Sequence, residues 1–270
     1  MRIVFAIARR EFSAYFEAPI GWICLFCFVG ITGLFFTDAV SALPELVYAM
    51  AMSNPYTANI DIFNRVFIPQ RFQFVLVLLI FICPAITMRL FSTEYRNGTI
   101  EFLLSSPVSS TQIVFGKYIG SLGFLAVLIA GILPQIFILL WMGNASPGVV
   151  AGGLIACVLV GAAYIAVGMI AGAFTDEQLL AGILSFCTLL AMLVLTQLDP
   201  TGNGTTVTDL EPWDHLKHNL KIIISNASIH GHMSSLIRGS IRLSDLIYFI
   251  SFITMAIILT SWRIESRRWR

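Results

Sequence analysis

The chain has 270 residues, of which 57% are hydrophobic and only 11% are charged, and its formal net charge is +1. Because a typical soluble domain carries about 25% charged residues, this composition excludes an ordinary water-facing globular surface and favours one that faces lipid. The near-zero net charge gives no indication of binding to nucleic acid or to acidic substrates.

The N-terminal segment, residues 1–17, alternates Arg and Glu with Ile, Val, Phe and Tyr. This pattern predicts an amphipathic helix that lies in the membrane interface, and a simple extension of the first span is the alternative. The first apolar run starts only after Ala18, and no cleavage site of the A-x-A type follows Phe36. We therefore expect this run to be a retained span and not a signal peptide.

Six apolar stretches are long enough, or nearly so, to cross a membrane as helices, which takes roughly 20 residues. They are residues 19–37, 72–88, 118–142, 149–174, 179–198 and 246–262. Pro134 predicts a kink in the third. The fold class is therefore all-α: a polytopic membrane protein with six transmembrane helices.

The orientation follows from the Lys and Arg residues of the connecting segments, which are enriched on the cytoplasmic side of a membrane. With the N-terminus inside, the inner segments hold Arg2, Arg9, Arg10, Arg89, Arg96, Lys117, Arg263, Arg267, Arg268 and Arg270. The outer segments hold fewer: Arg65, Arg71, Lys217, Lys221, Arg238 and Arg242. This bias places both termini in the cytoplasm, and six spans agree with both termini lying on the same side.

Two helix starts are predicted from capping boxes, in which a Ser or Thr is followed three residues later by Gln or Glu. The first is Ser109 with Gln112, and the second is Thr175 with Gln178. Small residues four apart also allow helices to pack closely in lipid. Three such pairs, which indicate a compact bundle or a dimer seam, are Gly116 with Gly120, Gly148 with Gly152, and Gly168 with Gly172.

The two outer segments are expected to be largely irregular. Residues 38–71 contain Pro44, Pro55 and Pro69, which predicts a loop with short helical pieces. In residues 199–245, the part from about 226 to 243 is interpreted as an interfacial helix that caps the bundle. Its Leu236, Ile237 and Ile241 would face the membrane, while Arg238 and Arg242 would reach lipid headgroups.

A metal site is the alternative for this outer segment, which carries His215, His218, His230 and His232. Zinc and copper sites need three or four ligands at defined spacing. No cysteine or tight carboxylate cluster accompanies these histidines, so the sequence favours the helix and no metal is expected.

The central parts of the spans contain no Asp, Glu, Lys, Arg or His. Such groups mark proton and ion paths, so their absence argues against a proton- or sodium-coupled transporter. Gly116 and Lys117 do not form a P-loop, because no glycine lies five residues before Gly116 and Tyr118 stands where Ser or Thr would bind magnesium. No cofactor is expected on this chain, and any ATP dependence must come from a partner.

The cytoplasmic segment after the second span combines charged residues, a turn at Asn97 and Gly98, and a short apolar helix that ends before Pro107. An ordinary loop would be shorter and more polar. A docking element for a soluble partner explains this pattern better.

This segment resembles the signature of ABC-2-type ABC transporter permeases. The residues that carry the resemblance are 88–91, 94–104 and 106–109, followed by 113–117, which end in Gly116 and Lys117. They reproduce the family's acidic–basic pair, Gly-Thr, second acidic residue, leucines, Pro-Val-Ser and Gly-Lys. Residues 238–239, 243–249 and 265–269 are similar to the gliding-motility GldF subgroup, which is related to the NosY-type permeases.

The resemblance implies one ABC-2 transmembrane domain over residues 1–270. It has an elbow helix at 1–17, a cytoplasmic coupling region at 89–112 that contains a coupling helix, and an extracytoplasmic loop at 199–245. The residues that would couple to the ATPase are Arg89, Glu94, Arg96, Gly98, Thr99, Glu101, Leu103, Leu104 and Pro107.

The resemblance also implies the surroundings of the chain. ABC ATPase subunits would bind ATP and magnesium, and a second permease half, either a second copy or a related chain, would complete the transmembrane part. An extracytoplasmic GldG-like protein is a further possible partner. The chain itself would not be an enzyme, and it would reside in a bacterial inner membrane.

Two functions from different classes fit these expectations. The first is a permease that couples ATP hydrolysis by a partner to export or to force transmission. The second is a membrane scaffold of an ABC-type machine, for gliding or envelope assembly, that moves no solute. Both need the same ATPase dock, so the sequence does not separate them.

Overall fold

The computed structural model describes residues 2–53, 63–92, 94, 98, 108–142, 145–197, 229–240 and 242–268. Over these residues the regular structure is helical, which confirms the all-α prediction. The α-helices are α1 (Arg2–Glu17), α2 (Pro19–Ser53), α3 (Ile68–Thr87), α6 (Ser110–Met142), α7 (Pro147–Phe174), α8 (Gln178–Gln197), α10 (Ile229–Ile237) and α11 (Leu243–Arg268). A short π-helix, η2 (Phe63–Phe67), leads directly into α3.

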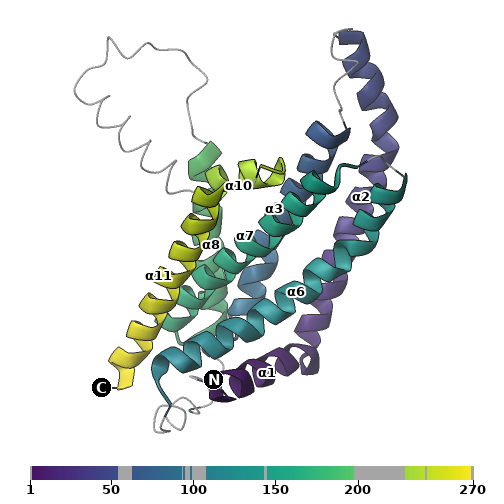
Figure 1. Ribbon diagram of the computed structural model, residues 1–270. Helices are drawn as coiled ribbons and strands as arrows, with labels where there is room; N and C mark the ends of the chain where they lie inside the picture. Colours follow the sequence, from purple (N-terminus) through teal and green to yellow (C-terminus); the bar gives the residue numbers. More distant parts are fainter. Residues whose placement is uncertain are drawn as a thin grey trace, which may run out of the picture.

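The long helices form an elongated bundle (Figure 1). Within the described ranges, five stretches are long and apolar enough to cross a membrane: Pro19–Leu46, Phe63–Thr87, Ser110–Trp141, Pro147–Phe174 and Leu243–Ser266. The remaining predicted span, at 179–198, corresponds to α8, whose apolar part Gln178–Val194 is shorter. The protein is therefore a multi-pass membrane protein, with both chain ends at the end of the bundle where α1 lies.

Helix α7 lies at the centre of the bundle, where it packs against α3, α6, α8, α10 and α11. Its many Gly and Ala residues let neighbours approach closely, since a small side chain leaves room for the next helix. A Cβ atom at Gly168 would lie only 2.1 Å from the Thr87 hydroxyl of α3, and one at Gly153 only 2.2 Å from the Phe72 ring. Of the predicted glycine pairs, Gly168 and Gly172 therefore contribute to packing inside the chain, since a Cβ atom at Gly172 would also contact the Phe91 ring, at 3.6 Å.

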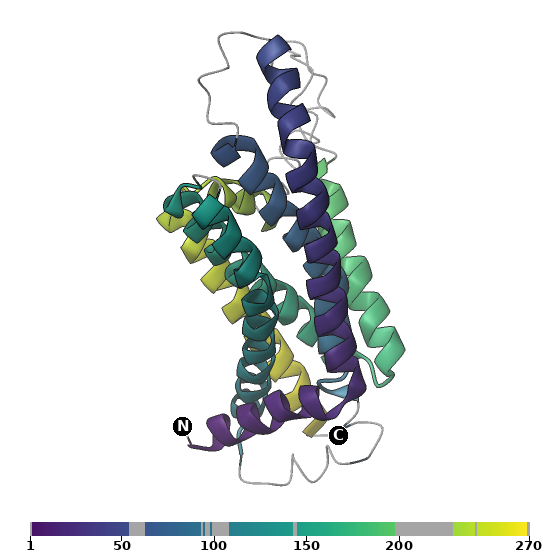
Figure 2. The same ribbon diagram turned by 90° about the vertical axis from the view of Figure 1, so that its right-hand side faces the viewer.

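Helix α1 crosses the end of the bundle at a steep angle to the other helices (Figure 2). It packs mainly on α6, where glycines provide the space. A Cβ atom at Gly116 would lie 2.9 Å from Ile7, and one at Gly120 would lie 2.7 Å from the Cβ atom of Glu11. The pair Gly116 and Gly120 thus provides the space in which α1 packs on α6.

The bend between α1 and α2 has a clear local cause. Pro19 disfavours helical backbone at the preceding Ala18, which ends α1 there. Gly21 then passes against the last turn of α1, because a Cβ atom at this position would lie 2.0 Å from the carbonyl oxygen of Tyr15. Trp22 donates its indole N–H to the Phe16 carbonyl at 3.0 Å. As a result, α1 is a separate helix and not a straight extension of α2.

The capping-box predictions have different outcomes. At the start of α6, the Gln112 N–H donates to the Ser109 hydroxyl at 3.3 Å, and the Ser109 N–H donates to the Gln112 side-chain oxygen at 3.4 Å, which confirms the first box. The second box is wrong. The Thr175 hydroxyl donates backwards to the Ala171 carbonyl of α7 at 3.1 Å, and α8 begins only at Gln178.

The first outer segment contains more helix than the sequence predicts. Helix α2 continues through Asp38 and Pro44 to Ser53 and projects beyond the rest of the bundle (Figure 1). The stretch is rich in Ala, Leu and Met, which favour helix. The remaining part, 54–62, lies outside the described residues.

The apolar stretch of the second span also begins earlier than predicted, at Phe63 instead of Phe72, and therefore includes Arg71. This guanidinium is 9% exposed; its Nη2 donates to the Thr32 carbonyl and to Gln135 Oε1, both at 3.0 Å, and it lies over the Phe36 ring. A cation is thus held between α2, α3 and α6, at a position predicted to lie in the first outer segment.

In the second outer segment, α10 caps the end of the bundle opposite α1 (Figure 1). The predicted direction of its apolar residues is wrong, because Leu236 is fully buried and Ile237 is 4% exposed against the protein. Arg238 and Arg242 are exposed, as predicted. Ile241 and residues 198–228 lie outside the described residues, and so do His215 and His218.

Candidate functional site

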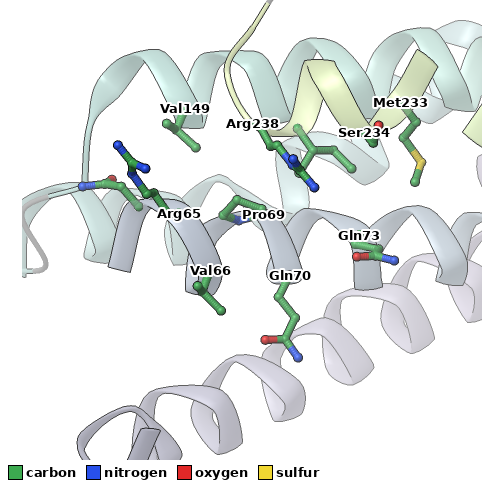
Figure 3. A pocket seen from close by; sticks show the side chains of 11 residues that line it. Arg65, Val66, Pro69, Gln70, Gln73, Val149, Met233, Ser234 and Arg238 are labelled. Atoms are coloured by element: carbon green, nitrogen blue, oxygen red, sulfur yellow. The ribbon is translucent and has the colours of Figure 1, made fainter. Parts of the chain in front are cut away.

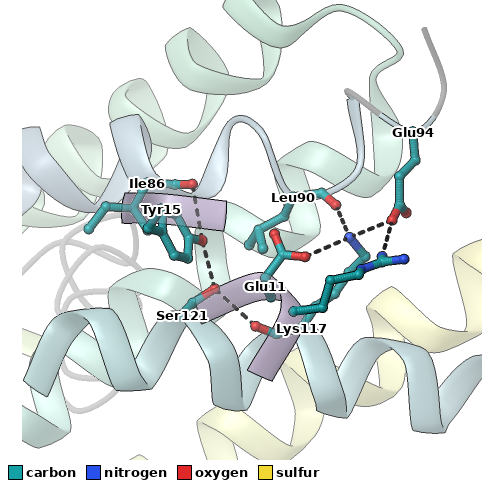
Figure 4. Close-up of polar contacts among 8 residues, drawn as sticks. Glu11, Tyr15, Ile86, Leu90, Glu94, Lys117 and Ser121 are labelled. Carbon is teal, nitrogen blue, oxygen red and sulfur yellow. Dashed lines mark hydrogen bonds and ion pairs between the residues drawn. The ribbon is translucent and has the colours of Figure 1, made fainter. Parts of the chain in front are cut away.

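Four charged residues lie close together at the end of the bundle where α1 lies, and Figure 4 shows their contacts. Arg10 and Glu11 belong to α1, Lys117 to the first turns of α6, and Glu94 lies just beyond the end of α3. We call these four residues the charge cluster. It joins three separate elements in a chain that carries few charges.

Lys117 is the centre of the charge cluster and is almost fully buried, at 1% exposure. Its ammonium nitrogen lies 3.0 Å from Glu94 Oε1 and 3.3 Å from Glu11 Oε2. It also donates a hydrogen bond to the Leu90 carbonyl and lies 5.3 Å from the centroid of the Phe91 ring. The three N–H donors of the ammonium therefore have three acceptors, which a buried lysine requires to remain charged.

The charges of the cluster balance. Arg10 Nη2 lies 3.0 Å from the same Glu94 oxygen, so two cations face two carboxylates. The Arg10 side chain is 59% exposed, whereas those of Glu11 and Glu94 are each only 14% exposed. Removing one member of a buried pair leaves an uncompensated charge, so the cluster fixes the relative positions of α1, α6 and the end of α3.

A second polar contact lies one turn along α1. The Ser121 hydroxyl donates to the Lys117 carbonyl at 3.0 Å, so the Tyr15 hydroxyl, 3.0 Å away, can donate to the Ser121 oxygen. Burial, with a contribution from the Glu11 charge, raises the pKa of Tyr15 far above its usual value, so the hydroxyl keeps its proton. The ring stacks on Phe124 at 4.8 Å between centroids. Tyr15 thus anchors the end of α1 in the bundle.

The last turns of α11 are attached to the same end of the bundle. Ser110, the first residue of α6, donates a hydrogen bond to Glu265. The guanidinium of Arg263 lies 5.0 Å from the centroid of the Phe174 ring, at the end of α7. The end of α11 is therefore attached to the start of α6 and to the end of α7.

The structure places three of the nine predicted coupling residues. Glu94 points inward, into the charge cluster. Arg89 is half-buried in the turn after α3, and Gly98 has the positive φ of +67° that suits glycine, at the predicted turn. The others lie outside the described residues: Arg96, Thr99, Glu101, Leu103, Leu104 and Pro107.

From the sequence, Lys117 and Arg10 count among the inner cations that set the orientation, and Lys117 is also part of the family pattern, but neither is paired with a carboxylate. The signal that could have joined them was their complementary charge. In a chain with 15 acidic and 16 basic residues, a lysine directly before a predicted span, as Lys117 is before residues 118–142, needs a carboxylate partner.

Comparison with known families gives one finding. A family model described as "ABC-2 family transporter protein" matches residues 5–264. This match covers both the charge cluster and the opposite end of the bundle, where α10 lies. A search of curated proteins found no match.

Proposed function

The chain belongs to the ABC-2 family of transporter proteins and is a membrane permease component; from this premise we propose that it is one permease half of an ATP-driven transporter. The ATPase is a separate chain that binds ATP and magnesium and docks at the end of the bundle where α1 lies. The observation that carries this proposal is the charge cluster. It connects the segment that follows α3, where the family signature lies, to α1 and α6.

In the proposed mechanism, the segment at 89–112 receives the movement of the ATPase. Glu94 lies at the start of this segment and is held by Lys117, so a displacement of the segment moves α6 directly. The same lysine holds Glu11, and α1 therefore follows. Because packed helices transmit displacement as rigid bodies, the cluster would convert a local push into a tilt of α1 and α6. The substrate that this movement exports, or the load that it pulls, is not specified by the cluster.

The proposed orientation places both termini and the charge cluster in the cytoplasm, with α10 outside and α1 as an elbow helix in the interface. In this arrangement α8 is the sixth span and residues 1–270 form one transmembrane domain. Both termini lie at the same end of the bundle, which supports an even number of crossings. The proposed location is a bacterial inner membrane.

The proposed assembly contains two permease halves related by two-fold symmetry, the commonest arrangement of oligomers. They are two copies of this chain or one copy with a related chain. The similarity of residues 238–249 to the GldF subgroup supports a GldF-like permease, and a GldG-like protein would be its extracytoplasmic partner.

Co-purification tests the proposal. The tagged chain is purified from its native membranes, its partners are identified, and ATP hydrolysis is measured for the reconstituted complex. We expect an ABC ATPase in the complex, and we expect Glu101→Arg to weaken its association. Arg242→Glu, at the opposite end of the bundle, is the matched control. Glu94→Arg would be unsuitable, because it would place a cation beside Lys117 and Arg10 and disturb the permease itself.

If no ABC ATPase co-purifies, or if Glu101→Arg and Arg242→Glu reduce its association equally, the proposed dock is wrong.

A further inference from the structure

A pocket of about 1070 Å³ lies at the end of the bundle opposite the charge cluster. It is enclosed by η2 and the first turns of α3 on one side, and by the start of α7 and the end of α10 on the other (Figure 3). This volume is at the upper end of the range of small-molecule sites, which is roughly 300–1,000 Å³. We call it the outer pocket.

The lining of the outer pocket combines positive charge with apolar surface. Arg65 contributes from η2 and Arg238 from the residue after α10, and Figure 3 shows both at this pocket. Neither guanidinium forms a hydrogen bond or ion pair with another described residue, and no described Asp or Glu lines the pocket. The rest of the lining includes the apolar side chains of Val66, Met233 and Ile237.

The two arginines stand on backbone that is held in place by specific contacts. On the first side, the Asn64 side-chain oxygen accepts the Ser146 N–H at 2.6 Å, which ties η2 to the start of α7. The π-helical turn that carries Arg65 is rare in proteins and occurs frequently at functional sites.

On the second side, α10 is fixed at two points. Both carboxylate oxygens of Asp245 in α11 contact α10: Oδ1 lies 2.7 Å from His232 Nδ1, and Oδ2 accepts a hydrogen bond from the Ser235 hydroxyl at 2.7 Å. The second point is the turn after α10, where Gly239 has a φ of +77° and packs against Gly152 of α7. A Cβ atom at Gly152 would lie only 2.7 Å from the Cα atom of Gly239. Arg238, directly before Gly239, is therefore held at the pocket by the turn that ends α10.

We propose that the outer pocket binds an anionic amphiphile whose headgroup carries a phosphate ester. Guanidinium groups bind phosphate through paired hydrogen bonds, so Arg65 and Arg238 hold the headgroup. The apolar wall of Val66, Met233 and Ile237 accommodates the adjoining part of the hydrocarbon chain. The pocket lies at the ends of the spans, at the level where headgroups meet the bundle. A free phosphate ion would use the arginines but would leave the apolar wall unused.

This inference goes beyond the proposed function and is independent of the ATPase. Its test uses the purified full-length chain in neutral detergent micelles, without any partner. A photoactivatable phosphatidylglycerol is titrated, and covalent adducts are measured by mass spectrometry. Competitors are unlabelled phosphatidylglycerol, phosphatidylcholine and inorganic phosphate. The variants are Arg65→Gln, Arg238→Gln and their combination, and Arg242→Gln is the matched control, an exposed arginine outside the pocket.

We expect adducts on residues of the outer pocket, displaced by phosphatidylglycerol but not by phosphatidylcholine. Each single variant should raise the half-saturating concentration roughly three- to tenfold, as the loss of one charge-assisted contact predicts. Arg242→Gln should leave it unchanged, and Arg65→Lys should lie between wild type and Arg65→Gln. Thermal unfolding of each variant confirms that it is folded.

Three results would overturn the proposal. Labelling that is unchanged in a folded double variant would show that the arginines do not hold the headgroup. Equal competition by phosphatidylcholine would show that negative charge is not recognised. Displacement by inorganic phosphate as effective as that by phosphatidylglycerol would show a simple anion site.

Discussion

Replacing Lys117 by Met should destabilise the helix bundle measurably, because it removes the centre of the charge cluster while approximately preserving volume. The ammonium is 3.0 Å from Glu94 Oε1, and at an effective dielectric constant of about 20 such a pair attracts by roughly 5 kcal/mol before desolvation is counted. Deleting one partner of a buried pair typically costs about 3–5 kcal/mol.

The expected loss for Lys117→Met lies below that range, at about 2–3 kcal/mol in the free energy of unfolding. The reason is that Glu94 keeps its contact with Arg10, and that the side chains of Glu94 and Glu11 are each 14% exposed. Neutralising one carboxylate as well, in Lys117→Met with Glu94→Gln, should restore part of the loss. The coupling energy between the two positions should be about 1 kcal/mol or more.

The assay is reversible unfolding in mixed micelles with increasing SDS, followed by circular dichroism and tryptophan fluorescence. Arg9→Met is the matched control, since Arg9 is exposed on the same end of the bundle and forms no ion pair with a described residue; a change within about 0.5 kcal/mol is expected. If Lys117→Met lowers the free energy of unfolding no more than Arg9→Met does, the charge cluster does not stabilise the bundle. If the loss in the double variant is the sum of the two single losses, Lys117 and Glu94 are not coupled.

Two further predictions concern the packing of α1 and α10. Gly120→Val should displace α1 from α6 and lower the free energy of unfolding by about 1–3 kcal/mol, because its Cβ atom would lie 2.7 Å from Glu11 of α1. Gly148→Ala is the control, since a Cβ atom at Gly148 has no neighbour within 4 Å. Equal losses of unfolding free energy in the two variants would show that α1 does not pack at Gly120. Asp245→Ala should release α10, which is measured with a cysteine at position 233 in a background without the five native cysteines. Met233 is 2% exposed, so this cysteine should react with a membrane-impermeant maleimide only after α10 is released. Arg242→Gln should leave the cysteine protected, and continued protection in Asp245→Ala would contradict the role of the carboxylate.

The elements that could be located from the sequence are those that depend on residues close together in the chain. Most spans follow from continuous apolar runs, and the start of α6 follows from the capping box at Ser109 because both of its bonds are local. The close packing of helices follows from glycines four residues apart. The partner at each glycine could not be predicted, since Gly116 and Gly152 each belong to a pair of glycines four residues apart but contact α1 and the end of α10 respectively.

The errors arose where a distant contact decides the outcome. Leu236 and Ile237 were expected to face lipid, but α7 and α11 provide a protein surface for α10, and an apolar side chain packs equally well on either. Thr175 had the right spacing for a cap, yet its hydroxyl is satisfied by the preceding helix. In the charge cluster, Arg10 and Glu94 are separated by 84 positions in the chain, and Glu11 and Lys117 by 106 positions. No local sequence pattern contains these pairs.

Photo-crosslinking in the assembled complex tests whether an ABC ATPase docks on the segment between α3 and α6. A genetically encoded photoreactive residue is placed at Gly98 or Glu101, in the proposed ATPase dock, and in separate samples at Ser234, in the outer pocket. We expect covalent adducts between an ABC ATPase and the first two positions, whose yield changes when nucleotide is added, and no adducts from Ser234. ATPase adducts at Ser234, or an assembled complex in which neither Gly98 nor Glu101 reaches an ATPase, would contradict this expectation.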